Sequence, residues 1–290
     1  MTAFMHQVIA GLSTGGIYAS VALALVMIYQ TTHHINFAQG ELAMFSTYLA
    51  WSLLAAGVPY WITFFLTILI AFTLGVLIER FIIRPLAATP TLGVVVVFIG
   101  LLTIFHSLAA WIFSSSLKTF PSPFPHHAVF AGHLISAHDV GAIGITLTVV
   151  LSLHIFIRST SLGLALRAVA QDPVSSRLVG IRVHRLLALG WGLAAAIGAI
   201  AGMMAAPVVY LEPNMMSGIL ICAFAGALIG GITSPGGAVF GGFLVGVLEN
   251  LLGTYVIGNE LKLSVALFLI VGVLLLRPSG LFGRTSVPRV

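Results

Sequence analysis

Long apolar segments follow one another through almost the whole chain, separated only by short polar or glycine-rich stretches. We place nine of them, at about residues 6–29, 35–57, 61–79, 92–114, 140–157, 187–207, 216–233, 238–253 and 262–276. A membrane helix needs roughly 20 apolar residues, and backbone groups in lipid must find hydrogen-bond partners locally. The sequence therefore predicts an all-α polytopic membrane protein. We expect about eight or nine transmembrane helices in a single domain over residues 1–290.

Composition supports this class. Hydrophobic residues make up 59% of the chain and charged residues 7%, whereas a soluble domain carries about 25% charged residues. A soluble fold would have too few charges to cover its surface. The calculated pI is about 9.8, but the basic residues sit at the ends of apolar segments and form no continuous patch. That distribution favours membrane lipid over nucleic acid as the partner.

Polar or glycine-rich turns interrupt residues 35–57 and 216–253, so we expect that one of these segments can be re-entrant. In the second segment, Ser234-Pro235-Gly236-Gly237 cannot continue a helix. Glycines recur around this break, at Gly226, Gly230, Gly241, Gly242 and Gly246. Small residues let membrane helices approach closely, and broken helices can line a transport pathway. The two interpretations are compatible.

Ten of the twelve basic residues fall into three clusters, which fix the orientation. The clusters are Arg80 and Arg84; Arg158, Arg167, Arg177, Arg182 and Arg185; and Arg277, Arg284 and Arg289. The positive-inside rule places all three in the cytoplasm and leaves Lys118 and Lys262 outside. This assignment predicts a cytoplasmic loop at about 158–186 and an external loop at about 115–139. The N-terminus is external if all nine segments cross.

The external loop contains a loose group of histidines: His126, His127, His133 and His138. Imidazole is a common zinc ligand, but nothing in the spacing defines a tetrahedral site. We therefore expect no metal site there and assign the histidines a structural or incidental role. The single cysteine, Cys222, lies in an apolar run and is expected to be a small buried side chain.

Motifs for catalysis are missing. Neither lysine follows a glycine-rich phosphate-binding turn, and we find no dinucleotide fingerprint, catalytic triad or paired-carboxylate site. The chain is therefore not expected to be an enzyme or to need a cofactor. If its activity consumes ATP, the ATP site must lie in a partner.

The cytoplasmic loop encodes a short capped helix. Residues 162–171 favour a helix, and Asp172-Pro173 then supplies an N-cap followed by the residue type preferred at the first helical position. Gly180 is a natural terminator. Val174, Leu178 and Ile181 can form an apolar edge on this short helix. A helix of under two turns needs a surface to dock on, which is either a protein partner or the membrane.

Four blocks in this chain resemble the permease subunits of branched-chain amino-acid ABC importers, the LivH-like family. In the loop, the matching residues are Ser161-Leu162-Gly163, Ala165, Arg167-Ala168, Ala170-Gln171 and Gly180-Ile181. The other blocks are 11–18 (GLSTGGIY) with 35–41 (INFAQGE), 230–242 (GGITSPGGAVFGG) with Glu249, and 277–283 (RPSGLFG). Their order and spacing run through nearly the whole chain.

The resemblance implies a type II ABC importer permease in a bacterial inner membrane. It implies a second, LivM-like permease subunit, two cytoplasmic ATPase subunits and a periplasmic solute-binding protein. The ATPases would dock on the loop, where the family pattern and the capped helix single out Gly163, Arg167, Ala168, Asp172, Pro173 and Gly180. Two departures stand out, because the family usually has histidine at Gln39 and often a basic residue at Leu164.

Polar residues inside apolar segments are costly and mark candidate functional positions. We expect Asn36, Gln39 and Glu41 to form one group and Glu249 another, lining the pathway or joining helices by hydrogen bonds. His106 is expected to pack against a neighbouring helix. Glu79 and Arg80, at a segment end, are expected to form a solvated or interfacial pair.

Three functions remain open from these residues. The first is the permease of an ABC importer for branched-chain amino acids, with urea, amides or aromatic acids as alternative solutes within the family. The second is an ion-coupled secondary transporter that uses Glu41, His106 and Glu249 as a relay. The third is a membrane scaffold that carries no solute.

Overall fold

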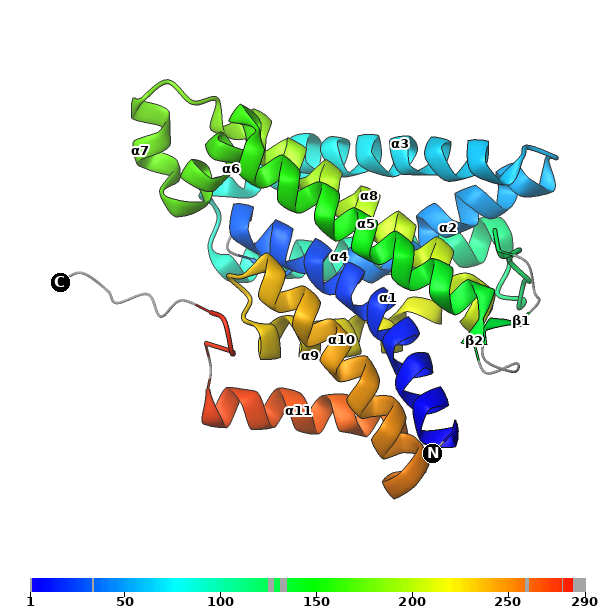
Figure 1. Ribbon diagram of the computed structural model, residues 1–290. Coiled ribbons are helices and arrows are strands. Elements are labelled where there is room, and N and C mark those ends of the chain that lie inside the picture. The colour runs from blue at the N-terminus through cyan, green and yellow to red at the C-terminus, as the bar shows by residue number, and fades with distance from the viewer. Residues whose placement is uncertain are drawn as a thin grey trace. The chain divides into compact units, whose positions relative to one another are not determined.

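The computed structural model describes residues 2–32, 34–124, 128–130, 135–258, 261–277 and 279–283. These residues are almost entirely helical, as Figure 1 shows. The helices are α1 (Thr2–Thr32), α2 (Gln39–Ala55), α3 (Tyr60–Ile78), α4 (Thr91–Phe113), α5 (Ala137–Ser159), α6 (Ser161–Gln171), α7 (Pro173–Leu178), α8 (Val183–Val209), α9 (Met215–Gly230), α10 (Pro235–Leu252) and α11 (Lys262–Leu276). The expectation of an all-helical protein is confirmed.

Several short elements complete the fold. A π-helical turn, η1 (Glu79–Ile83), and a 3-10 turn, η2 (Arg84–Ala88), continue α3, and a second π-helical turn, η3 (Gly253–Ile257), continues α10. Between α4 and α5, β1 (Ala128–Phe130) pairs antiparallel with β2 (Ile135–Ser136). These two short strands interrupt the otherwise helical architecture of the described residues.

Six helical stretches among the described residues are long and apolar enough to cross a membrane. They are Phe4–Thr32, Tyr60–Leu86, Thr91–Phe113, Ala137–Ser159, Val183–Val209 and Pro235–Ile257. The apolar helices α9 and α11 are shorter. Large apolar side chains such as Phe65, Leu92 and Trp111 are exposed on α3 and α4. In a membrane this surface would face lipid, as expected of an integral membrane protein.

The chain divides into two compact units. One contains residues 27–123 and 147–216, and the other contains residues 1–26, 124–146 and 217–290. In the first unit, α8 packs along α3 and α2 (Figure 1). The close approach depends on Gly75, where an added Cβ would lie 2.6 Å from the carbonyl oxygen of Trp191. Trp191 itself is fully buried.

In the second unit, glycines bring α10 against both α1 and α9. An added Cβ at Gly246 would lie 2.3 Å from the Cα of Gly15, and one at Gly226 would lie 2.7 Å from the Cα of Gly242. Helix packing through small residues is therefore confirmed for this glycine-rich region.

The predicted helix break between 216–233 and 238–253 is also confirmed. α9 ends at Gly230, and α10 begins at Pro235. The side chain of Ser234 caps α10 by accepting a hydrogen bond from the Gly237 N–H at 3.1 Å. Residues 281 and 282 contact the end of α9 at this break. The N–H groups of Leu281 and Phe282 donate to the terminal carbonyls of α9, at Ile229 and Gly230.

Candidate functional site

The basic loop at 158–186 folds into α6 and α7. The Thr160 hydroxyl caps α6 by accepting from the Gly163 N–H at 3.0 Å. The inward face of α6 carries Leu166 and Val169, which pack with Val183 and Leu186 at the start of α8. The loop is therefore held on the body of the protein by its own apolar cluster.

Asp172 starts α7 as the sequence predicts. Its Oδ1 accepts hydrogen bonds from the N–H groups of Val174 at 2.9 Å and Ser175 at 3.1 Å, and Pro173 is the first helical residue. The Ser175 hydroxyl donates to the same carboxylate, and these bonds from Ser175 lower the pKa of Asp172. Gly180 ends the helix with φ +84°. The predicted short capped helix is confirmed.

Gly163 sits where the chain turns sharply from α5 into α6. A Cβ at this position would lie 2.4 Å from the carbonyl oxygens of Phe156 and Ile157. Backbone atoms cannot move aside as a flexible side chain can. Glycine at this position is therefore a steric requirement of the turn.

Exposed apolar side chains lie on α6, on α7 and directly after α7, and we call this set the α6–α7 face. Leu164 is 62% exposed, Val174 69%, Leu178 85% and Val179 76%. Arg167 and Arg177 are also exposed on these helices. The predicted apolar edge was partly wrong, because Ile181 packs against the buried cluster of α6 and α8. Val179 is exposed instead.

A buried ion pair lies beside the loop. The carboxylate of Glu79, which is 1% exposed, accepts from Arg84 Nη2 at 2.7 Å, and Arg84 Nη2 also donates to the carbonyl oxygen of His184 at 3.3 Å. The predicted solvated pair between Glu79 and Arg80 was wrong. The π-helical turn η1 brings residue i+5 onto the face of residue i, so Arg84 reaches Glu79. Arg80 lies over the ring of Phe81.

The entry to α2 carries two of the predicted intramembrane polar residues. Asn36 and Gln39 are fully buried, and Asn36 Nδ2 donates to Gln39 Oε1 at 3.5 Å. Gln39 Nε2 donates to the carbonyl oxygen of Ala194 on α8 at 2.9 Å. Gln39 therefore joins α2 to α8 without a titratable group.

Glu41 does not join that pair. It is 7% exposed, and its Oε2 lies 3.4 Å from Nδ1 of His106 on α4. The expected grouping of Glu41 with Asn36 and Gln39 was wrong, because Glu41 follows Gln39 by two residues and therefore lies on a different face of α2, towards α4. His106 does pack against a neighbouring helix, as predicted, and does so through this carboxylate.

Glu249 occupies a separate place, in the unit that contains α1, α9 and α10. Its carboxyl group forms hydrogen bonds with the side chains of Tyr18 on α1 and Cys222 on α9. Cys222 is 1% exposed, which confirms its expected burial. The next residue, Asn250, accepts from Lys262 Nζ at 3.3 Å and donates to the carbonyl oxygen of Gln7 at 3.2 Å. These polar contacts join α10 to α1, α9 and α11.

Two of these partnerships could not be found from the sequence. The pairing of Arg84 with Glu79 depends on the π-helical turn. The contact of Tyr18 with Glu249 was not predictable because Tyr18 looks like an ordinary aromatic residue within an apolar helix. Of the external histidines, His126, His127 and His133 lie outside the described residues, and His138 packs against the ring of Phe124. Within the described part of the chain, no three histidine, cysteine or acidic side chains are grouped as a metal site.

Comparisons with known proteins show which family the chain resembles. Residues 7–274 match the family described as the permease component of the branched-chain amino acid transport system. The chain is 34% identical to the high-affinity branched-chain amino acid transport system permease protein BraD of Pseudomonas aeruginosa, over 99% of this chain and 98% of that protein. It is 32% identical to the corresponding protein LivH of Escherichia coli, with the same coverage.

A more distant relative is the probable branched-chain amino acid transport permease protein LivH of Methanocaldococcus jannaschii, which is 25% identical over 91% of this chain and 87% of that protein. Among solved structures, PsaBC from Streptococcus pneumoniae in complex with Fab aligns with a TM-score of 0.52 and 14% identity. The alignment covers 93% of this chain and 91% of that one, and it supports the fold alone. From the family match and the full-length relatives, the chain belongs to the family of branched-chain amino acid transport permease components.

Proposed function

We propose that this chain is a permease subunit of an ATP-binding-cassette importer in a bacterial inner membrane. The observation that carries the proposal is the α6–α7 face. It combines a rigidly capped α7 with exposed apolar side chains, including Leu178 at 85% exposure. An exposed apolar patch rimmed by charge is typical of a protein interface. Membership of the permease family supports an ATPase as the partner of this face.

Each predicted loop residue has a role in this proposal. Gly163 allows the α5–α6 turn, Asp172 and Pro173 start α7, and Gly180 ends it. Arg167 is exposed on α6 and would meet an acidic group of the ATPase. The small side chain of Ala168, next to it, would let the ATPase approach α6 closely. Closure of two ATPases on nucleotide would then move α7 together with α6, because the two helices are contiguous.

The remaining partners follow from the family. We propose a second, LivM-like permease subunit in the membrane, two ATPase subunits in the cytoplasm and a periplasmic solute-binding protein. The chain acts as one permease domain of eight or nine membrane helices. In this assignment α2, α9 and α11 add to the six long spans, and α9 with its turn into α10 is the candidate re-entrant segment.

The proposed solutes are branched-chain amino acids, as the names of the relatives state for those proteins. We propose that Glu41 and Glu249 face the pathway or act next to it, and that Asn36 and Gln39 act indirectly by fixing α2 on α8. Glutamine at position 39 removes a protonatable group from this position. Proton transfer through residue 39 itself is therefore disfavoured in this chain.

Reconstituted transport tests the proposal. The two permease subunits and their ATPases are placed in liposomes with the binding protein and radiolabelled leucine. Uptake should require internal ATP and should persist when ionophores remove all ion gradients. Uptake that continues without the ATPases and stops with the ionophores would instead establish an ion-coupled secondary transporter. If the complete complex transports none of the solutes that its binding protein supplies, the result would support a membrane scaffold.

A further inference from the structure

A cavity of about 200 Å³ lies behind α7, within the unit of residues 27–123 and 147–216. Its walls come from the end of α1, the η1 and η2 turns, the start of α4, α7 and the start of α8. Four of the six long spans begin or end at these elements. The cavity therefore lies at the ends of spans, next to Arg84 and Arg177 of two basic clusters, which the positive-inside rule assigns to the cytoplasmic side.

The lining is amphipathic. Its polar lining residues include Arg84, Arg177 and His184 together with threonines, and its apolar lining residues include Ile83, Leu86 and Val94. Phe81, on the same π-helical turn as Ile83, is 68% exposed, and Leu92, at the start of α4 near Val94, is 79% exposed. These exposed apolar side chains would suit acyl chains.

The charges in the cavity favour an anion. Its acidic residue, Glu79, already accepts two hydrogen bonds from Arg84. Arg177 forms no ion pair within the described part of the chain and is exposed. The remaining charge is therefore positive. A zwitterionic amino acid is a poorer fit, because the carboxylate that could hold its ammonium group is already occupied by a guanidinium.

We propose that this cavity binds the phosphate group of an anionic phospholipid from the cytoplasmic leaflet, with Arg177 as the principal contact and the acyl chains along η1 and α4. Basic pockets between membrane helices on the cytoplasmic side commonly hold lipid headgroups, and guanidinium groups suit phosphate oxygens. Because Pro173 and Arg177 belong to α7, a bound lipid would also stabilise the position of α7. That consequence for coupling rests on the proposed function, whereas lipid binding itself does not.

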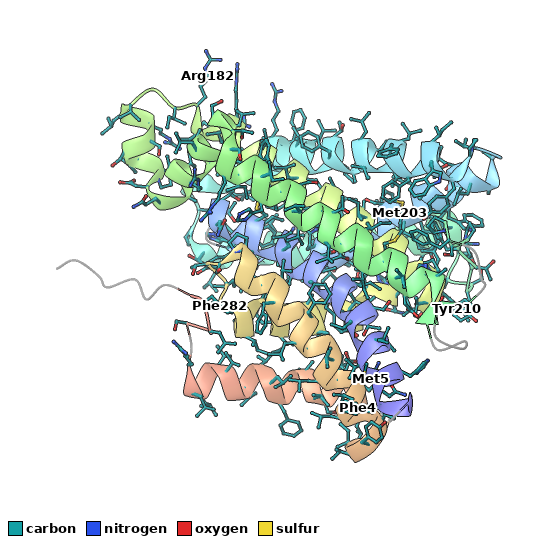
Figure 2. The ribbon with its side chains drawn as sticks, in the orientation of Figure 1. Phe4, Met5, Arg182, Met203, Tyr210 and Phe282 are labelled. Carbon is teal, nitrogen blue, oxygen red and sulfur yellow. The ribbon has the colours of Figure 1, made fainter. Side chains whose placement is uncertain are left out.

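The test is native mass spectrometry of the full chain, purified with its partner subunits and supplied with phosphatidylglycerol or phosphatidylcholine. The wild-type protein should retain phosphatidylglycerol preferentially. Arg177→Gln should weaken that retention by about fivefold, the effect of one basic side chain near an anionic headgroup, and Arg177→Lys should restore most of it. Arg182→Gln is the matched control, because Arg182 extends away from the helices in Figure 2 and does not line the cavity. It should bind lipid as the wild type does.

Several results would overturn the proposal. Equal retention of the two lipids, or unchanged phosphatidylglycerol retention in Arg177→Gln, would show that the cavity is not an anionic headgroup site. Displacement of the lipid by millimolar inorganic phosphate would identify a free-phosphate site, and displacement by leucine would identify a solute site. The readout needs neither ATP hydrolysis nor uptake, so its failure is distinguishable from failure of the proposed transport function.

Discussion

Arg84 Nη2 lies 2.7 Å from the Glu79 carboxylate across a single π-helical turn, and the same nitrogen reaches the backbone carbonyl of His184. One side chain thus neutralises a buried acid directly after α3 and ties the C-terminal end of α3 to the first turn of α8. Since α8 follows α7 directly, the ion pair links a long span to the loop that carries the α6–α7 face.

Arg84→Gln should destabilise the protein because it leaves the Glu79 carboxylate buried without its counter-ion. Breaking a buried pair costs about 3–5 kcal/mol, and we expect about 2 kcal/mol here because the Arg84 side chain is 32% exposed and partly screened. Denaturant unfolding in detergent measures the change. Adding Glu79→Gln should recover part of the loss. Arg80→Gln, which removes an exposed cation, should change stability by under about 0.5 kcal/mol.

Gly163→Ala should distort the start of α6, because the new Cβ meets two backbone carbonyl oxygens at 2.4 Å. We expect a cost of about 1–3 kcal/mol, as for other overpacked sites. Faster amide exchange across residues 161–178 would report it. Gly144→Ala on α5, where no atom lies within 4 Å of the added Cβ, is the matched control. Unchanged exchange in both variants would contradict the steric requirement at Gly163.

The pH dependence of α7 follows from Asp172. Hydrogen bonds from Ser175 lower the pKa of Asp172 below its ordinary value of 3.8. A group whose pKa is lower in the folded state stabilises the fold above its ordinary pKa. That contribution is lost as the pH falls through the depressed folded value. Amide protection of α7 should therefore be constant from neutral pH down to about the ordinary carboxyl pKa and should fall only below it.

Substitutions at Asp172 separate capping from titration. Asp172→Asn keeps an N-cap acceptor and should remove the acid-dependent loss of protection. Asp172→Ala removes the N-cap acceptor and should lower the amide protection of α7 already at neutral pH. Acid sensitivity that survives in Asp172→Asn would assign the effect to another group.

Tyr18 and Glu249 should be energetically coupled, since their side chains join α1 to α10 by a hydrogen bond. A double-mutant cycle with Tyr18→Phe and Glu249→Gln should give a coupling energy of about 1 kcal/mol. Unfolding in detergent micelles provides the four stabilities. Strict additivity would mean that the hydrogen bond contributes nothing to holding the two helices together.

The parts of this molecule that local chemistry determines were predictable. Asp172-Pro173 and Gly180 specify where α7 begins and ends, and Ser234-Pro235 marks the break between α9 and α10, although α10 begins at Pro235 and not at the predicted residue 238. Partners across the fold were not predictable. Glu249 meets Tyr18 and Cys222 from distant parts of the sequence, and periodicity alone does not reveal which helices become neighbours.

The Glu79–Arg84 pair shows a different limit of prediction from the sequence. A regular α-helix places residues i+3 and i+4 beside residue i, so a sequence reading assumes that spacing. The π-helical turn shifts the register and selects residue i+5. The prediction that Ile181 lies on the exposed edge of α7 also assumed regular helical spacing. The helix ends before Gly180, and Ile181 packs instead against the cluster of α6 and α8.

The central claim is that α7 receives the ATPase, and retention of the ATPase by the purified permease complex tests it most directly. Leu178→Asp places a charge at the most exposed apolar side chain of the α6–α7 face and should release the ATPase while leaving the permease folded. Leu117→Asp, at a 67% exposed leucine between α4 and α5, should leave ATPase retention unchanged. Full retention of the ATPase by Leu178→Asp, with uptake as in the wild type, would contradict the claim.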